Sequence, residues 1–214
     1  MKILKPKIFI FLSRIKVIKA FNNLLRPELV LTISGSGELT VKEHDPGAVL
    51  RELLIKRVPD CSAAFELDHT PSGQLKAKLK NAFCQLSCLI HGSHPKANKS
   101  CDFVIVSPGV DKSRIVLADL KSRSPKKADC AAQLRNSELF LMYIISLISE
   151  YHGENIKPEF KKVVFFVVSA TNAKAPAQQG NRQKPFEQDG VTYFPVVVRG
   201  RNNSKAIVTY PDFS

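Results

Sequence analysis

Two aspartates and a lysine lie at matching ends of two neighbouring apolar segments. Asp102 opens the segment CDFVIV, and Asp119 lies near the end of RIVLADLKS, with Lys121 two residues further on. The connection SPGVDKS is rich in turn residues, so the segments are expected to form a β-hairpin. A hairpin symmetric about residues 110–111 sets Asp102 opposite Asp119, with Cβ atoms roughly 5 Å apart. Facing carboxylates destabilise a sheet unless a cation lies between them, which favours a functional role.

Lys121 adds a positive charge to this pair. Residues two apart on a strand share a face, so Lys121 should lie beside Asp119 while Leu120 points into the core. Two acids and a lysine on one surface are the minimal set for metal-assisted hydrolysis of a phosphodiester. The alternative is a solvated ion pair between Asp119 and Lys121 at a strand end.

The first quarter of the chain is expected to form an accessory layer. Apolar spacing predicts a basic amphipathic helix over residues 8–25, and ELVLTISGSGELTVKE predicts two short strands around a Ser-Gly-Ser-Gly turn. Asp45-Pro46 resembles an N-cap followed by a first-turn proline, which predicts a helix over residues 47–57. We therefore expect an accessory region at residues 1–62 and a main domain at residues 63–214.

The remaining elements alternate between helix and strand. Helical spacing predicts a helix over residues 72–91, and Ser124-Pro125 predicts the start of a helix that reaches about Tyr151, buried on most sides in its second half. KKVVFFVVSA is typical of a central strand, residues 171–190 of a loop, and residues 191–200 and 205–212 of a closing hairpin. This order predicts an α/β fold with a mixed central sheet flanked by helices.

These residues resemble the PD-(D/E)xK nucleases, which have the restriction-endonuclease-like fold. The family pattern is an acid at the start of one strand, then an acid, any residue and a lysine at the end of the next, then a helix and a further strand. The matching residues are Asp102, the Asp119-Leu120-Lys121 triplet, the helix from Pro125 and the strand at residues 161–170. Cys101 stands where the family often has proline, and Asp119 where glutamate is common. The resemblance covers roughly residues 66–170.

The resemblance implies a metal-dependent nuclease. Asp102, Asp119 and the backbone carbonyl of Leu120 would hold Mg²⁺ or Mn²⁺, since all three are hard oxygen ligands. Lys121 would orient or activate the attacking water and offset charge in the transition state.

Further site residues are candidates by the same resemblance. Many members add a glutamate from the preceding region, for which Glu66 is the first candidate and Glu52 the second; Asp68 and His69 are alternative ligands or N-cap residues. One branch of the family, resembling RecB-type nucleases, has a glutamine early in the helix, which Gln133 matches. That branch has a tyrosine four residues later, where this chain has Ser137.

Charge points to a polyanionic partner. The net charge of +13 is spread along the whole chain, as expected of a folded protein that contacts phosphates. Lys126, Lys127 and Arg135, near the start of the helix after the motif, could hold DNA phosphates or face water. A merely basic surface is the alternative.

Cysteine usage and hydropathy bear on location and metal content. Five cysteines without a disulfide framework favour a reducing cytoplasm, and no apolar run is long enough to cross a bilayer. Cys84, Cys88, His91, His94 and Cys101 include zinc donors, but paired CxxC motifs are absent and helical cysteines often act as small hydrophobes.

The sequence thus predicts a cytoplasmic Mg²⁺-dependent nuclease, with DNA a better substrate than RNA and no membrane partner. A bacterial antiviral defence effector is the suggested setting, by analogy alone. A homodimer and a complex with a regulatory subunit both fit. The alternatives are a non-catalytic nucleic-acid-binding or assembly subunit of the same fold and a zinc-stabilised interaction module.

Overall fold

The computed structural model describes residues 6–45, 47–68, 99–168, 184–198 and 204–214. Two α-helices lie within these ranges, α1 (Pro6–Leu24) and α3 (Lys127–His152), with the short 3-10 helices η1 (Pro27–Leu29) and η3 (Tyr210–Asp212). In this part of the chain, no helix combines the length and apolarity needed to cross a membrane. The helix expected over residues 72–91 lies outside the described residues.

The central sheet is mixed, as expected. Across the sheet its strands are β1 (Val30–Leu31), β4 (Ala63–Glu66), β5 (Phe103–Pro108), β6 (Ser113–Lys121), β7 (Pro158–Val167), β9 (Val191–Val196) and β8 (Phe186–Gln188). The β6–β7 and β7–β9 pairs are parallel and the others antiparallel. The prediction of a central strand near residues 161–170 is confirmed, since β7 lies between β6 and β9.

A second sheet of three strands joins distant parts of the chain. Its central strand β3 (Glu52–Lys56) pairs antiparallel with β2 (Leu39–Lys42) and parallel with β10 (Lys205–Thr209). The expected boundary between residues 62 and 63 stays a prediction, but β10 comes from the far side of that boundary.

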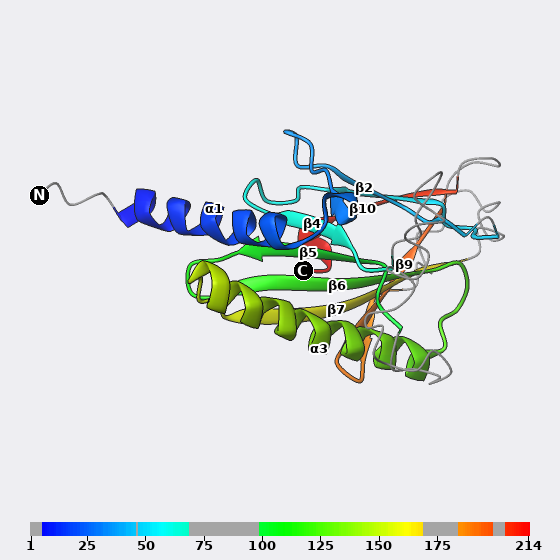
Figure 1. Ribbon diagram of the computed structural model, residues 1–214. Helices are drawn as coiled ribbons and strands as arrows, with labels where there is room; N and C mark the ends of the chain where they lie inside the picture. Colours follow the sequence, from blue (N-terminus) through cyan, green and yellow to red (C-terminus); the bar gives the residue numbers. More distant parts are fainter. Residues whose placement is uncertain (1–5, 46, 69–98, 169–183, 199–203) are drawn as a thin grey trace, which may run out of the picture.

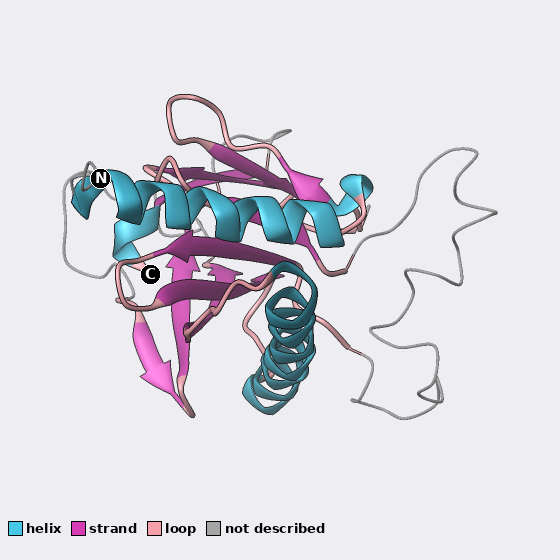
Figure 2. Cartoon of the chain, turned by 60° about the vertical axis from the view of Figure 1, so that its left-hand side comes forward, coloured by secondary structure: helices cyan, strands magenta, loops and turns pink. Residues whose placement is uncertain are grey.

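The molecule has three layers, with the central sheet in the middle (Figure 1). On one face, α1 and α3 pack against buried side chains that include Phe65, Val104 and Leu117. On the other face, a core that includes Phe103 and Phe165 packs against Leu53 and Ile55 of the second sheet. Figure 2 shows both helices on the same side of the central sheet. Among the described residues, helices therefore flank the central sheet on one face only, and the second face carries a sheet.

The β5–β6 hairpin is stabilised because the side chains on each of its two faces are buried in a hydrophobic core. Consecutive residues of β5 are buried from Phe103 to Val106, and alternate residues enter opposite clusters. Phe103 pairs with Ala118 and Pro108 with Ser113, which is the register expected from the symmetric turn.

The helix expected over residues 47–57 is a strand. Leu53 and Ile55 are fully buried and alternate with less buried neighbours, which is the period of a strand. Asp45 does cap a turn, because its Oδ1 accepts a hydrogen bond from the Gly47 amide at 2.8 Å, but no helix follows. Pairing on both sides, with β2 and β10, outweighs the local helical signal.

Three further expectations about the second half are wrong. The final segments do not pair as a hairpin: β9 and β10 belong to different sheets. Part of the expected loop is strand β8, which turns at Asp189-Gly190, both with positive φ, and pairs with β9. The helix after the motif is present and reaches His152, close to the expected end, but it begins at Lys127 without a side-chain cap. It is not buried on most sides, because Leu139, Met142 and Tyr143 are exposed. It ends at Gly153, which adopts the left-handed conformation that favours glycine.

Candidate active site

The ends of β5 and β6 bring the predicted acids together. Asp102 directly precedes β5, and its amide donates to the Ala118 carbonyl at 3.0 Å, beside Asp119. The Asp102 carboxylate reaches across the hairpin, where Oδ2 accepts a hydrogen bond of 2.5 Å from the Leu120 amide. The backbone of one strand therefore fixes the carboxylate of the other.

Lys121 lies beside Asp119, as their spacing predicts. Its Nζ is 2.7 Å from Oδ2 of Asp119, which is fully buried, while a third of the lysine side chain is exposed. Beyond this ion pair, Oδ2 accepts no hydrogen bond from the described residues. Leu120 points the other way, into the core between the two sheets. A buried carboxylate oxygen thus keeps unused capacity to bind a positive group.

A side chain of helix α3 contacts Oδ1, the other carboxylate oxygen of Asp119. The Gln133 amide donates to Oδ1 of Asp119 at 3.2 Å and also to the carbonyl of Ser100. One turn later, the buried Ser137 hydroxyl accepts a 2.7 Å hydrogen bond from the Cys101 amide. Gln133, predicted from the resemblance, does contact the acid pair. Ser137, at the position where that family branch has tyrosine, anchors the segment that leads to Asp102.

Burial and mutual repulsion shape the charge of the acid pair. Burial, followed by the negative charge of Asp119, holds the pKa of Asp102 well above its usual value, and Lys121 offsets only part of this. Burial also raises the pKa of Asp119, opposed by Lys121. Burial lowers the pKa of Lys121, but its pairing with Asp119 outweighs that effect, so the net pKa is raised and the ammonium stays charged. The site favours one extra proton or an added cation.

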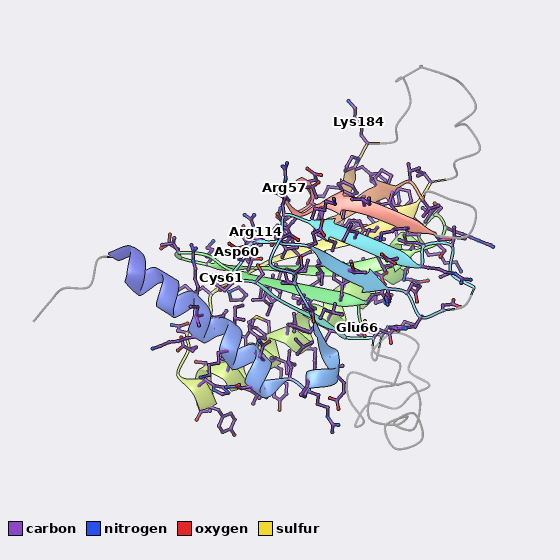
Figure 3. All side chains as sticks on the ribbon, turned by 90° about the horizontal axis from the view of Figure 1, so that it is seen from above. Arg57, Asp60, Cys61, Glu66, Arg114 and Lys184 are labelled. Carbon is purple, nitrogen blue, oxygen red and sulfur yellow. The ribbon has the colours of Figure 1, made fainter. Side chains whose placement is uncertain are left out.

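A pocket of about 250 Å³ opens beside Asp102, between the two sheets. Its walls combine the end of β4, the start of β5 and the segment after β2; the polar side chains in this lining are Lys42, Glu43, His44, Asp45, Glu66, Asp68 and Asp102. Glu66, at the end of β4, is buried and lies 3.6 Å from Nε2 of His44. Figure 3 shows Glu66 apart from Cys61 and Arg114, which lie at the other end of the sheet.

Glu43 is the acid that the sequence did not single out. It follows β2, and its negative charge contributes to raising the pKa of Asp102, Asp119 and Asp68. For Asp68, at the exposed rim, desolvation is the largest cause and Glu43 the second. No sequence signal marks Glu43, because only the packing of the second sheet against the first brings it near the site.

The other predicted residues have different surroundings. Glu52 forms an ion pair with Lys205 inside the second sheet and does not line the pocket. Nζ of Lys127 is 2.6 Å from Oε1 of Gln188 and 5.0 Å from the centre of the Phe186 ring, so this lysine holds strand β8 against α3. Lys126 is exposed at the start of α3 and Arg135 on its outer face. His69 and the histidines and two cysteines of the zinc hypothesis lie outside the described residues.

The carboxylate oxygens of Asp102 and Asp119 suit a hard divalent cation, but they are few as side-chain ligands. Asp102 and Asp119 are adjacent, and Oδ2 of Asp119 has spare acceptor capacity. Within the described ranges, no group of three or more histidine, cysteine, aspartate or glutamate side chains is arranged to hold a metal ion. A cation at this position would therefore take two carboxylates and complete its coordination with backbone oxygen and water.

Comparison with known proteins identifies no relative. No family model matches the chain, and neither a curated protein nor a solved structure matches it.

Proposed function

We propose that the protein is a metal-dependent nuclease that hydrolyses phosphodiester bonds of nucleic acid, with DNA as the preferred substrate. The observation that carries this proposal is the pair of the fully buried Asp119 and the half-buried Asp102, with Lys121 in contact with Asp119. Two adjacent carboxylates with little access to water raise the free energy of the folded state. Hydrogen bonds from the Leu120 amide and the Gln133 side chain, together with the charge of Lys121, offset that cost only in part. A bound divalent cation would relieve the remaining repulsion.

The cation fits the residues present, and its ligands would be Asp102, Asp119 and the backbone carbonyl of Leu120. Bound there, it would polarise a phosphate and lower the pKa of a coordinated water. Glu66 and Glu43, at the adjoining pocket, would act through water or through their charge, since the described residues form no three-carboxylate cluster.

Lys121 and Gln133 supply the chain's own contribution to the reaction. The partly exposed ammonium of Lys121 reaches the surface, where it can hold a water next to the scissile phosphate and stabilise the added negative charge. As the water oxygen bonds to phosphorus, the bond to the leaving oxygen breaks, and the proton that the water loses is balanced by protonation of the leaving oxygen. Gln133 keeps the Asp119 carboxylate in one orientation.

The strand order supports a restriction-endonuclease-like core as the finer description of the fold. Strands β4, β5 and β6 form an antiparallel meander, and α3 then leads to β7 beside and parallel to β6. The acids lie at the end of the β5–β6 pair, which is where the resemblance expects them. The net charge of +13 further supports a nucleic-acid substrate.

A digestion panel tests this function. Supercoiled plasmid, linear duplex, single-stranded DNA and RNA are incubated with Mg²⁺ or Mn²⁺, with EDTA as control. We expect metal-dependent nicking or cutting of DNA. Binding that falls steeply with salt, without cleavage of any substrate in either metal, would contradict the proposal.

That outcome would support the second candidate, a nucleic-acid-binding or assembly subunit of the same fold. The specific observation in its favour is that the described residues offer only two adjacent carboxylates and no third converging ligand. Lys121 already neutralises one of the two charges, so such a protein would need no cation to remain folded.

A further inference from the structure

Helix α3 carries an apolar stripe on its outer face that nothing in the described structure covers. Leu139, Met142 and Tyr143 are 60%, 42% and 58% exposed, unlike the opposite side of the same helix, where Leu141, Ile144 and Ile148 enter the core. Residues at this spacing fall on one narrow face of a helix. Large apolar side chains grouped in this way are typical of a surface that binds another protein.

Charged residues bracket the stripe, one of each sign. Arg135 lies one turn before Leu139, and Glu150 lies about two turns after Tyr143, on the same face and about 22 Å from Arg135 along the axis. Both side chains are exposed, and neither forms an ion pair or hydrogen bond within the described residues. By contrast Glu138, on the flank, pairs with Lys162 of β7 at 2.6 Å.

The stripe is complementary to itself under a two-fold rotation. If two copies of α3 pack antiparallel about an axis between Met142 and Tyr143, each residue faces the one equally far on the other side of that centre. Arg135 then faces Glu150 of the second copy, and Met142 faces Tyr143, a favourable contact between sulfur and an aromatic ring. Leu139 faces Ser146, whose small side chain leaves room for it.

Ser146 is suited to an apolar interface although it is polar. Its hydroxyl donates to the Met142 carbonyl of its own helix at 2.9 Å, so it needs no hydrogen bond from a partner. The face therefore sets Leu139 opposite a small side chain, and it places opposite charges at matching distances from the centre.

We propose that the outer face of α3 is the contact surface of a homodimer, formed by antiparallel pairing of two α3 helices with Arg135 of each copy opposite Glu150 of the other. The residues that form this surface are Arg135, Leu139, Met142, Tyr143, Ser146 and Glu150. This assembly does not rest on nuclease activity, because none of these residues contacts the acid pair. The two sites lie at opposite ends of the helix pair, with the two copies of Gln133 about 29 Å apart along the axis.

Charge reversal with rescue tests the pairing. The oligomeric state of the full chain is measured by sedimentation over a range of micromolar concentrations at fixed ionic strength. We expect a monomer–dimer equilibrium for the wild type. Arg135→Glu and Glu150→Arg should each weaken dimerisation by about tenfold or more, because each turns two attractive contacts into two repulsive ones. The double variant Arg135→Glu/Glu150→Arg should restore the wild-type dimer.

Two further variants show whether the α3 stripe itself forms the contact. Leu139→Asp should also give a monomer, whereas Lys56→Glu, in the second sheet on the other side of the molecule, should leave the dimer unchanged. A wild-type monomer at every concentration would overturn the proposal and leave the stripe to another occupant. A dimer whose affinity is indifferent to the single reversals would also overturn it. A third result would overturn it as well: Arg135→Glu binds DNA more weakly but keeps the oligomeric state of the wild type. Arg135 would then be a phosphate-binding residue.

Discussion

Replacing Asp102 by asparagine should make the protein more stable while removing its activity. Asparagine keeps the shape of the side chain and an oxygen that can accept the hydrogen bond from the Leu120 amide. It removes the charge that burial and Asp119 make unfavourable. If this substitution stabilises the fold and abolishes the reaction, the role of Asp102 is functional and not structural.

The size of the effect follows from Coulomb's law. Two unit charges about 5 Å apart at an effective dielectric constant of about 20 repel by roughly 3 kcal/mol. The attraction of Asp102 to Lys121 is weaker than this repulsion and returns only part of it. We therefore expect Asp102→Asn to raise the free energy of unfolding at neutral pH by about 1–2 kcal/mol, which is about 2–8 °C in Tm for a chain of this size.

The gain should depend on pH in a defined direction. Because the pKa of Asp102 is higher in the folded than in the unfolded protein, ionisation is disfavoured only in the folded state. Below the ordinary value of 3.8 both states are protonated, so the variant and the wild type should then be equally stable. The advantage of Asp102→Asn should grow as the pH rises from that value towards the folded-state pKa.

Urea unfolding at a series of pH values measures this difference. Asp111→Asn, at the exposed tip of the same hairpin, is the matched control and should change stability little at any pH. A destabilised Asp102→Asn protein, or a gain that is the same at low and neutral pH, would show that charge repulsion at Asp102 does not destabilise the folded state.

Three further predictions concern residues around the acid pair and in the core. Glu43→Gln should move the acidic limb of the pH–rate profile to lower pH, because loss of its charge lowers the pKa of Asp102; an unmoved limb would exclude this influence. Gln133→Ala should lower kcat by about tenfold or more with little change in KM, because Asp119 loses its orienting hydrogen bond. Equal kcat values for Gln133→Ala and the wild type would contradict that role. Phe165→Ala should cost about 3–5 kcal/mol of unfolding free energy, as Phe165 is fully buried between the sheets; Val110→Ala, at an exposed turn, should cost under about 0.5 kcal/mol.

The local parts of the site can be predicted from the sequence. The hairpin register depends on a short turn and on alternation along two strands, so the meeting of Asp102 with Asp119 follows from nearby residues alone. The contact of Lys121 with Asp119 follows from the period of a strand. The contact of Gln133 with Asp119 is predicted only through the resemblance to a family.

The contributions from distant segments cannot be predicted in this way. Residues 47–57 carry a helical start signal, and pairing with β2 on one side and with β10, about 150 residues later, on the other makes Glu52–Lys56 a strand. Glu43 follows β2 of this second sheet and reaches the pocket because that sheet packs on the central one. The prediction of a closing hairpin is wrong for a related reason: β9 and β10 are similar apolar segments, and nothing local indicates that they enter different sheets.

Catalysis by the pair of Asp102 and Asp119 is tested most sharply by the rate of plasmid cleavage. This rate is measured for the wild type and for Asp119→Asn, with Mg²⁺ and with EDTA. Asp119→Asn is compared after its folding and salt-sensitive DNA binding have been shown to match those of the wild type. We expect cleavage by the wild type in Mg²⁺ only, and a loss of at least about a hundredfold in Asp119→Asn. Undiminished Mg²⁺-dependent cutting by Asp119→Asn would mean that the pair of Asp102 and Asp119 is not the catalytic site.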